Sequence, residues 1–353
     1  MKSRRYRGEW LLLLGSLLVL AVLAGLAELA VRAFSSVDLL GNSRNLFVAK
    51  AWGDSNGNAP NVEAIAFDQV VYTDEHGFRV PKGGVPEDAA KREAILILGD
   101  SVGFGAGIDE PETFAGLLRA RFPERRVYNS SVIGYSTPDY RNVVQGFVPS
   151  HPEVTAVVLL YCLNDVTAAT SEHIDRYLKQ QASPPKSLTE TLRSVQLLSD
   201  ANDYLRSRSK LYLFIRHQLL RTQMRDWKLV LQLYSPEHAG EAAQSVRDIA
   251  DISAALQARG IPLIVVLSPF EYQLRRPDDP ETQVPQRIVL DLLAKAGIDA
   301  IDPRPSFDAS VPSADYFLGY DAMHLSARGH RVIADVVTEA LQKVGSGVAS
   351  PPH

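Results

Sequence analysis

A serine stands directly after a strongly apolar run, where its hydroxyl could act as a nucleophile. Residues 94–107 read AILILGDSVGFGAG, which places Ser101 in a glycine-rich corner. A short apolar run bounded by turn residues is typical of a buried strand. The corner therefore has three interpretations: ordinary turn chemistry, a phosphate cradle, or a hydroxyl held out for nucleophilic attack.

The glycine spacing argues against a phosphate cradle. A P-loop requires G-x-x-x-x-G-K-[ST], and no Lys-Ser or Lys-Thr follows these glycines. A dinucleotide-binding turn requires G-x-G-x-x-G opening directly into a helix. Here Gly103, Gly105 and Gly107 run as G-x-G-x-G, and the clear helical pattern begins only near Pro111. We therefore expect no nucleotide site at this corner.

A second Gly-Asp-Ser, at Gly53–Ser55, bears on the turn interpretation. This copy follows no apolar strand and precedes no helix, so we predict a loop there. The tripeptide alone is weak evidence for a nucleophile. Only the copy that ends at Ser101 has the strand–turn–helix context that exposes a hydroxyl over a sheet edge.

A serine needs a base to take its proton, and one histidine stands in a suitable corner. The segment YDAMHLSARGH places Asp321 three residues before His324, just ahead of the last predicted helix. In a turn, this spacing lets the carboxylate orient the imidazole, while the other ring nitrogen faces a serine. His330 is the strongest rival, but it lies inside the predicted helix. We expect the histidines other than His324 to be surface residues: His76, His151, His173, His217, His238, His330 and His353.

Acyl transfer also needs hydrogen-bond donors for a developing oxyanion, and two other strand ends supply candidates. Gly134 follows the second strand in YNSSVIGYS, and Asn164 follows the third in LLYCLND. A sheet with the strand order 2-1-3 places both beside Ser101 at one edge. Taken singly, Gly134 is also compatible with a turn, and Asn164 with a turn or a cap.

These segments together resemble the SGNH hydrolases, also called the GDSL esterase/lipase family. ILILGDSVGFG is similar to the first block of that family, NSSVIGYS to the second, LLYCLND to the third and DAMH to the fifth. The resemblance implies that Ser101 is the nucleophile, with His324 and Asp321 as its partners. It also implies an oxyanion hole formed by the amides of Ser101 and Gly134 and by the side chain of Asn164. It implies no metal and no organic cofactor. The upstream segment YTDEHGFRVP resembles a lead-in segment of membrane-anchored members.

One position departs from the family pattern. The glycine of the third block is Cys162 here, at the end of a predicted buried strand, where it is a poor alternative nucleophile. The side chain of Asn164 supplies the donor, so we expect little loss. We expect Asp100 to point away from Ser101 and to bond to the backbone.

The order of apolar runs predicts an α/β fold. Strand-like runs alternate with helical patterns, which favours a parallel sheet covered on both faces. We predict a flavodoxin-like three-layer sandwich with a central five-stranded parallel sheet in the order 2-1-3-4-5. The predicted strands are 94–98, 126–132, 156–162, 261–267 and 297–302, and the predicted helices are 111–122, 242–260 and 326–345. Ser326 is the expected N-cap of the last helix.

The spacing of these elements predicts the division of the chain. The family resemblance covers residues 93–345, and a helical insertion at about 167–240 separates strands three and four. Within it, residues 210–220, KLYLFIRHQLL, are unusually apolar. We expect them to cover the active-site crevice, to face the membrane or a partner, or to pack on the sheet. Residues 35–92 are rich in turn formers and predict a stalk and a lead-in strand, and 346–353 predict a disordered tail.

The N-terminus predicts a membrane anchor. The basic residues Lys2, Arg4, Arg5 and Arg7 precede 18 uncharged residues from Trp10 to Ala27. At about 1.5 Å per residue this stretch nearly crosses a hydrocarbon core, and it can extend to residue 34. We expect an uncleaved single-pass anchor with the basic end in the cytoplasm and the rest outside it, in the periplasm. A cleaved signal peptide is the alternative.

The net charge and the motifs leave three hypotheses about the function of the chain. The net charge of −4 gives no sign of a nucleic-acid partner. The leading hypothesis is a serine ester hydrolase that removes acyl groups from an envelope carbohydrate or lipid, or from a small ester, through an acyl-enzyme. An O-acyltransferase that uses the same site, with a polysaccharide hydroxyl in place of water, is the second hypothesis. A non-catalytic scaffold among envelope polysaccharide-assembly proteins is the third.

Overall fold

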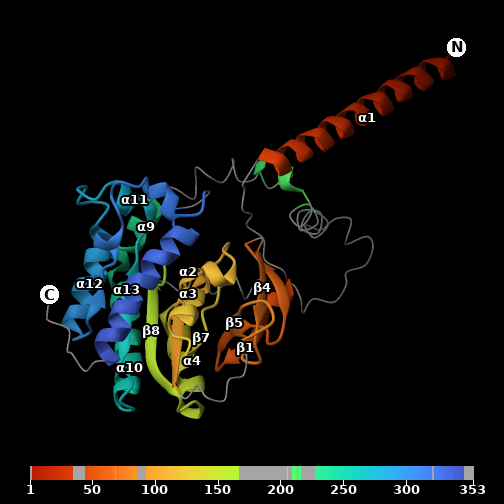
Figure 1. Cartoon of the computed structure of the whole chain (residues 1–353). Helices are drawn as coiled ribbons and strands as arrows, with labels where there is room; N and C mark the ends of the chain where they lie inside the picture. Colours follow the sequence, from red (N-terminus) through yellow and green to blue (C-terminus); the bar gives the residue numbers. More distant parts are fainter. Residues whose placement is uncertain are drawn as a thin grey trace.

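The fold is built around one mixed sheet with helices packed on it. The computed structural model describes residues 2–34, 44–67, 69–85, 93–166, 205, 209–212, 214, 215, 227–319 and 322–345 (Figure 1). The predicted tail at 346–353 and most of the predicted insertion lie outside the described residues.

The central sheet has eight strands, and its parallel half has the predicted order. In spatial order the strands are β10 (Ala300–Ile301), β9 (Leu263–Ser268), β8 (Val154–Cys162), β6 (Glu93–Gly99), β7 (Arg125–Asn129), β5 (Arg79–Val80), β4 (Gln69–Thr73) and β3 (Glu63–Ala66). The first five are parallel to one another. Read along the chain, they give the order 2-1-3-4-5, so the predicted α/β fold is confirmed.

The apolar runs of the sequence form the buried middle of this sheet. Ile95 to Leu98 of β6 and Val157 to Cys162 of β8 are at most 1% exposed. Strands that are apolar on both faces are typical of a parallel sheet covered by helices on each side. The carboxyl ends of β6 and β8, where Ser101 and Asn164 follow, therefore meet at one edge of the sheet.

The helices form two groups. α3 (Phe114–Arg121) contacts α13 (Ala327–Gly345), while α10 (Ala239–Gln257) contacts both α4 (Thr137–Phe147) and α12 (Val284–Lys295). Right-handed crossovers between parallel strands place these groups on opposite faces, as the predicted three layers require. The shorter helices are α2 (Ser101–Phe104), α9 (Trp227–Leu233) and α11 (Glu271–Arg275).

The predicted helix ends are present. Gly260 follows α10 with a positive φ of 69°, which favours glycine. The hydroxyl of Ser326 accepts a hydrogen bond from the Gly329 amide at 3.3 Å, so Ser326 caps α13 as predicted.

Residues 35–92 were expected to be a stalk with one lead-in strand. The lead-in strand is present as β4, but the irregular stalk is wrong for the part that the structure describes. β1 (Phe47–Trp52) and β2 (Ser55–Asn58) form an antiparallel hairpin. β5 pairs antiparallel with β7, and β4 and β3 continue the sheet, each antiparallel to its neighbour. The sheet is therefore mixed and wider than five strands. The turn formers that suggested irregular chain lie in the tight connections between these short strands, at the left-handed Gly53 and Asn61 among others.

The N-terminal helix α1 (Lys2–Phe34) extends away from the sheet (Figure 1). Its segment Leu12–Ala33 has a mean hydropathy of 2.4 and is long and apolar enough to cross a membrane. In the part of the chain that the structure describes, this is the one helix with those properties.

Candidate active site

Ser101 is the first residue of a one-turn helix that begins where β6 ends. Asp100 is the N-cap of α2, and its Oδ1 accepts a hydrogen bond from the Val102 amide at 2.8 Å. The sequence indicated a helix only from about Pro111, so this earlier turn was missed. Four residues are too few to show helical periodicity. The turn holds the Ser101 backbone at the carboxyl end of the central strand.

The glycines around Ser101 allow two backbones to come close together. A Cβ added to Gly99 would lie 2.9 Å from the Cα of Gly103. A Cβ added to Gly103 would lie 2.7 Å from the Oγ of Ser131. Glycine is therefore needed here for close approach of β6, α2 and the loop after β7, and not to surround a phosphate.

A fully buried arginine fixes the loop that follows Ser101. Arg79 in β5 donates to the carbonyl oxygens of Phe104 (2.6 Å), Gly105 (2.7 Å) and Ile108 (2.6 Å). Its guanidinium also lies over the Phe104 ring, 4.8 Å from the centroid. Burial lowers the pKa of Arg79 to about 9. The lead-in segment thus supplies a positioning residue, whose partners the sequence did not indicate.

The structure brings Ser101 and His324 together. The Nε2 atom of His324 lies 2.8 Å from the Oγ of Ser101. His324 is only 3% exposed, and its ring packs on Phe67 at a centroid distance of 4.7 Å. Its carbonyl oxygen accepts a hydrogen bond from the Leu318 amide at 2.8 Å, which ties the turn to the preceding segment. Asp321, which was predicted to orient the His324 imidazole, lies outside the described residues.

Asp100 does not point wholly away from Ser101. Its Oδ1 bonds to the backbone as expected, but its Oδ2 lies 3.4 Å from the Ser101 hydroxyl. Burial raises the pKa of Asp100, and hydrogen bonds from the Val102 amide and the Asn164 side chain, together with the charge of His324, act in the opposite direction. The carboxylate therefore organises the corner through both the backbone and Asn164.

The two predicted oxyanion donors lie on loops that follow neighbouring strands. Gly134, in the loop between β7 and α4, has a φ of +89°, a backbone conformation that favours glycine. Asn164 follows β8, which pairs directly with β6. Its side-chain nitrogen has two N–H groups, and one of them serves the hydrogen bond to Asp100.

Asp165 is a site residue that the sequence reasoning missed. Its Oδ2 accepts hydrogen bonds from the Cys162 amide (2.9 Å) and from the hydroxyl of Tyr140 in α4 (2.8 Å). Burial and the nearby Asp100 raise the pKa of Asp165 well above its usual range. Asp165 thereby links the Asn164 turn to the helix that follows Gly134. A buried carboxylate next to Asn164 was visible in the sequence, but its partner in α4 was not.

Two other predictions concern buried groups. Cys162 is a free thiol that is 1% exposed, and burial raises its pKa well above the usual range. This environment disfavours the thiolate, as expected for a residue that ends a buried strand.

His330 was expected at the surface, and that expectation is wrong. It is 1% exposed, and its Nδ1 accepts a hydrogen bond from the Phe114 amide at 3.3 Å.

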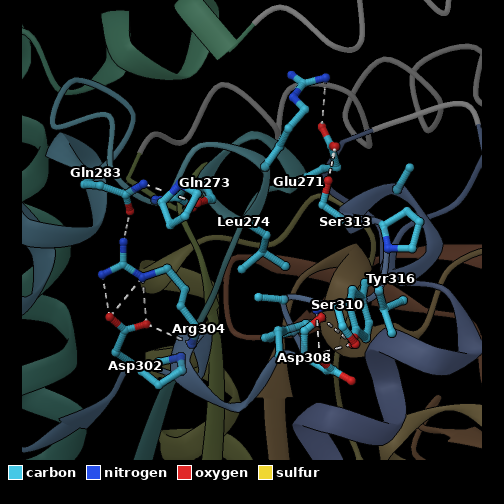
Figure 2. A pocket seen from close by; sticks show the side chains of 18 of the residues that line it. Glu271, Gln273, Leu274, Gln283, Asp302, Arg304, Asp308, Ser310, Ser313 and Tyr316 are labelled. Atoms are coloured by element: carbon cyan, nitrogen blue, oxygen red, sulfur yellow. Dashed lines mark hydrogen bonds and ion pairs between the residues drawn. The ribbon is translucent and has the colours of Figure 1, made fainter.

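An open cavity of about 1150 Å³ lies beside α11 and α12 (Figure 2). Arg304 forms part of its wall and bonds to both Asp302 and Gln283. On another side, the Ser313 hydroxyl donates to Oε1 of Glu271 at 2.6 Å. Figure 2 shows these charged and amide groups facing the cavity from several elements.

This cavity adjoins the turn that carries His324. The Glu271 amide donates to the carbonyl oxygen of Ala322 at 2.7 Å, two residues before His324. Neither Ser101 nor His324 lines the cavity itself. It is therefore a neighbouring space at the carboxyl end of β9 and not the reaction centre.

Residues 225–352 match the family model described as SGNH hydrolase-like domain, acetyltransferase AlgX. No curated protein matches the chain. Similar solved structures include the α/β hydrolase LAE5 from the Lake Arreo metagenome (16% identity, 73% of this chain and 97% of that one, TM-score 0.40). Others are a lipase/acylhydrolase from Enterococcus faecalis (12%, 74% and 99%, 0.40) and the acetyl xylan esterase AlAXEase (15%, 70% and 99%, 0.39).

The family match confirms the resemblance to SGNH hydrolases that the sequence motifs indicated. The matched range contains the His324 corner, while Ser101, Gly134 and Asn164 precede it. At TM-scores near 0.4, the structural likenesses carry no argument about the reaction.

Proposed function

We propose that this chain, which contains an SGNH hydrolase-like domain, is a serine enzyme that transfers acyl groups from oxygen esters. The observation that carries the proposal is the 2.8 Å contact between Nε2 of His324 and Oγ of Ser101. A histidine at that distance can remove the hydroxyl proton during attack. Both groups are almost fully buried, so the contact is shielded from bulk water.

The proposed reaction has two balanced steps. Oγ of Ser101 bonds to the ester carbonyl carbon while its proton passes to Nε2 of His324. The alcohol then leaves with that proton, and an acyl-enzyme remains. In the second step a water or an acceptor hydroxyl gives its proton to Nε2 and attacks the acyl carbon, after which the proton returns to Ser101. Asp321 is proposed, from the family resemblance, to orient the imidazole.

The oxyanion of each tetrahedral intermediate needs fixed donors. We assign these to the amides of Ser101 and Gly134 and to the side-chain amide of Asn164. Asn164 can serve Asp100 with one N–H and the oxyanion with the other. The bond to Asp100 would hold the Asn164 side chain in place before the substrate binds.

An O-acyltransferase is the second candidate, and the cavity beside α11 and α12 favours it. The matched family model is described as an acetyltransferase. The cavity combines arginine, carboxylate and amide groups with the aromatic rings of Tyr316 and Phe307. Such a mixture suits a polyhydroxylated acceptor such as a glycan chain. We propose that the acylated donor reaches Ser101 and that a glycan lies in the cavity.

A chromogenic acetate ester tests both candidates. We expect the full chain to release the chromophore and a fluorophosphonate to label Ser101. A hydrolase will release acetate at an equal rate, whereas a transferase will acetylate added glycan. Labelling of a different serine, or no turnover with or without acceptor, would overturn the catalytic proposal and favour the scaffold hypothesis.

A matched pair of arginine variants tests the role of the cavity. Arg287 is exposed and lines the cavity, whereas Arg247 is exposed on α10 and bonds to Gln244. Arg287→Ala should raise KM for the glycan several-fold and leave turnover of the small ester unchanged. Arg247→Ala should change neither. Equal KM values for the two variants would exclude the cavity as the glycan site.

We further propose that the chain is anchored by α1, with the SGNH domain outside the cytoplasm. The apolar length of Leu12–Ala33 and the basic residues before it support this placement. The ester or glycan substrate would then be a component of the cell envelope.

A further inference from the structure

The end of α1 is hydrogen-bonded to a segment far along the chain. The carboxylate of Glu28 accepts hydrogen bonds from the Ser209 hydroxyl (2.8 Å), the Lys210 amide (2.8 Å) and the Leu211 amide (2.7 Å). Arg32, one turn later in α1, also donates to it at 2.7 Å. Glu28 thus joins the predicted anchor to the insertion between β8 and β9.

These bonds form a helix cap that two parts of the chain share. Residues 210–212 are helical, and the Tyr212 amide donates to the Ser209 hydroxyl at 3.0 Å. The amides of Lys210 and Leu211 bond to Glu28 instead. The first three amide groups of a helix have no partner within it, and a carboxylate at this end is favourable. Glu28 therefore holds the start of this helix against α1.

The position of Glu28 sets the depth of this segment. Glu28 lies near the end of Leu12–Ala33, and at 1.5 Å per residue it is about 8 Å before the end of that apolar stretch. If α1 spans a membrane, this is the outer boundary between acyl chains and headgroups. Groups that bond directly to Glu28 must lie at the same depth.

The segment presents apolar side chains at that depth. Leu211 and Ile215 are four residues apart, so they share one helix face. The side chain of Ile215 is 50% exposed, and Leu205 just before the segment is 39% exposed. Lys210 supplies a long cationic side chain at the start. Apolar residues on one face with a basic residue beside them are typical of helices that lie in the membrane interface.

We propose that residues 209–212, 214 and 215, here named the docking segment, lie on the outer surface of the lipid bilayer and are held there by Glu28. The partner of this surface is the lipid itself, with Leu211 and Ile215 facing the acyl chains and Lys210 facing the headgroups. The inference rests on the proposed membrane anchor, but not on the proposed ester chemistry. It would hold this part of the insertion at the membrane.

Fluorescence of the full chain in vesicles of phosphatidylcholine and phosphatidylglycerol tests this proposal. An environment-sensitive fluorophore is attached through Ile215→Cys, with Val344→Cys as the control, since Val344 is exposed at the end of α13. The native Cys162 is buried and will not compete for the label. We expect spin-labelled lipid to quench the fluorophore at 215 and to leave the one at 344 unquenched.

Removal of the cap should release the docking segment. Glu28→Ala should lower lipid quenching at 215 towards that of the 344 control, and aqueous iodide should then quench the label. Glu9→Ala removes a carboxylate from the opposite end of α1 and should leave quenching unchanged. The melting temperature reports that each variant is folded. Ser101→Ala should abolish small-ester turnover without altering lipid quenching, which separates the ester chemistry from this proposal.

Three results would overturn the proposal. Strong iodide quenching at 215 in the parent chain would place the segment in water. Protection from both iodide and lipid would place it against protein. Retained lipid quenching in Glu28→Ala would show that Glu28 does not hold the segment.

Discussion

Ser101 and His324 form the proposed reactive pair, and they are in contact although 223 positions separate them. Each side chain has little effect without the other, because the hydroxyl needs a base and the base needs a nucleophile. Asp100, which lies beside Ser101, links this pair by a hydrogen bond to Asn164, the proposed oxyanion donor. At this scale, function depends on single atoms and their separations.

Loss of either member should remove nearly all ester turnover. We expect Ser101→Ala and His324→Ala each to reduce kcat to close to background, and the double variant to be no worse, because the pair acts as a unit. The measurement is kcat with a chromogenic acetate ester, with the melting temperature as a check on folding. Substantial turnover by Ser101→Ala would show that another residue is the nucleophile.

The second Gly-Asp-Ser provides a matched control with its own expected effect. We first expected a loop residue, but Ser55 begins β2 and is 6% exposed. Its hydroxyl donates to Asp139 at 2.6 Å and accepts from Asn142 at 2.9 Å, which joins the hairpin to α4.

Ser55→Ala should therefore affect stability and spare catalysis. It removes two side-chain hydrogen bonds, one of them to the buried Asp139, so we expect a loss of roughly 1–3 kcal/mol in the free energy of unfolding. Urea denaturation measures this loss, and kcat for the small ester should stay within about twofold of the parent. An unchanged unfolding midpoint would contradict the role of Ser55 as a tie between the hairpin and α4.

Tyr140 should act on catalysis through Asp165 and the Asn164 turn. Removing one oxyanion donor by Asn164→Ala should lower kcat about 10²–10³-fold. Tyr140→Phe deletes only the hydroxyl that binds Asp165, so we expect roughly a tenfold lower kcat with KM unchanged, through misplacement of the donor.

A double-mutant cycle distinguishes positioning from general loosening. In the Asn164→Ala background, Tyr140→Phe should have no further effect on kcat, because the donor that it positions is already gone. If instead the loss of kcat in the double variant is the product of the losses in the two single variants, Tyr140 acts elsewhere.

At the scale of elements, the contact between α3 and α13 contains a pH-sensitive histidine. Burial, with the charges of Arg79 and His324, lowers the pKa of His330 to about 3 from 6.5. Between these values the unfolded chain binds the extra proton and the folded chain does not. Stability therefore falls as the pH drops from about 6.5 towards 3, by about 1.4 kcal/mol per pH unit for this group.

Replacement of this histidine should flatten that dependence. His330→Gln keeps an acceptor for the Phe114 amide but cannot titrate, so its stability should change less between pH 6.5 and 4. Unfolding free energies measured across this range test the prediction, and equal slopes for parent and His330→Gln would contradict it.

At the scale of the whole molecule, the proposed anchor α1 would decide on which side of the membrane the rest of the chain lies. A C-terminal alkaline phosphatase fusion should be active and a matching fluorescent-protein fusion dark, because the basic N-terminus is expected to remain in the cytoplasm. The opposite pattern would place the SGNH domain inside the cell. A mature N-terminus near residue 34 would instead identify a cleaved signal peptide.

The sequence by itself determined the parallel sheet and the chemical character of its edge. Buried strands such as β6 and β8 are continuous apolar runs, and the polar residues that end them stand next to them in the chain. Apolar patterning and turn chemistry act over a few residues, so they can be read locally. The motifs around Ser101, Asn164 and His324 are local in the same sense.

Only the tertiary structure decided which distant groups support this edge. Arg79 meets the carbonyls after Ser101, Tyr140 meets Asp165, and Ser55 meets Asp139, although nothing near these residues in the chain indicates their partners. Strand β5 likewise pairs with β7, and β4 and β3 follow in turn beyond it, although β7 lies far along the chain. A buried polar group must find a partner, but chain packing over long sequence distances selects which partner it finds.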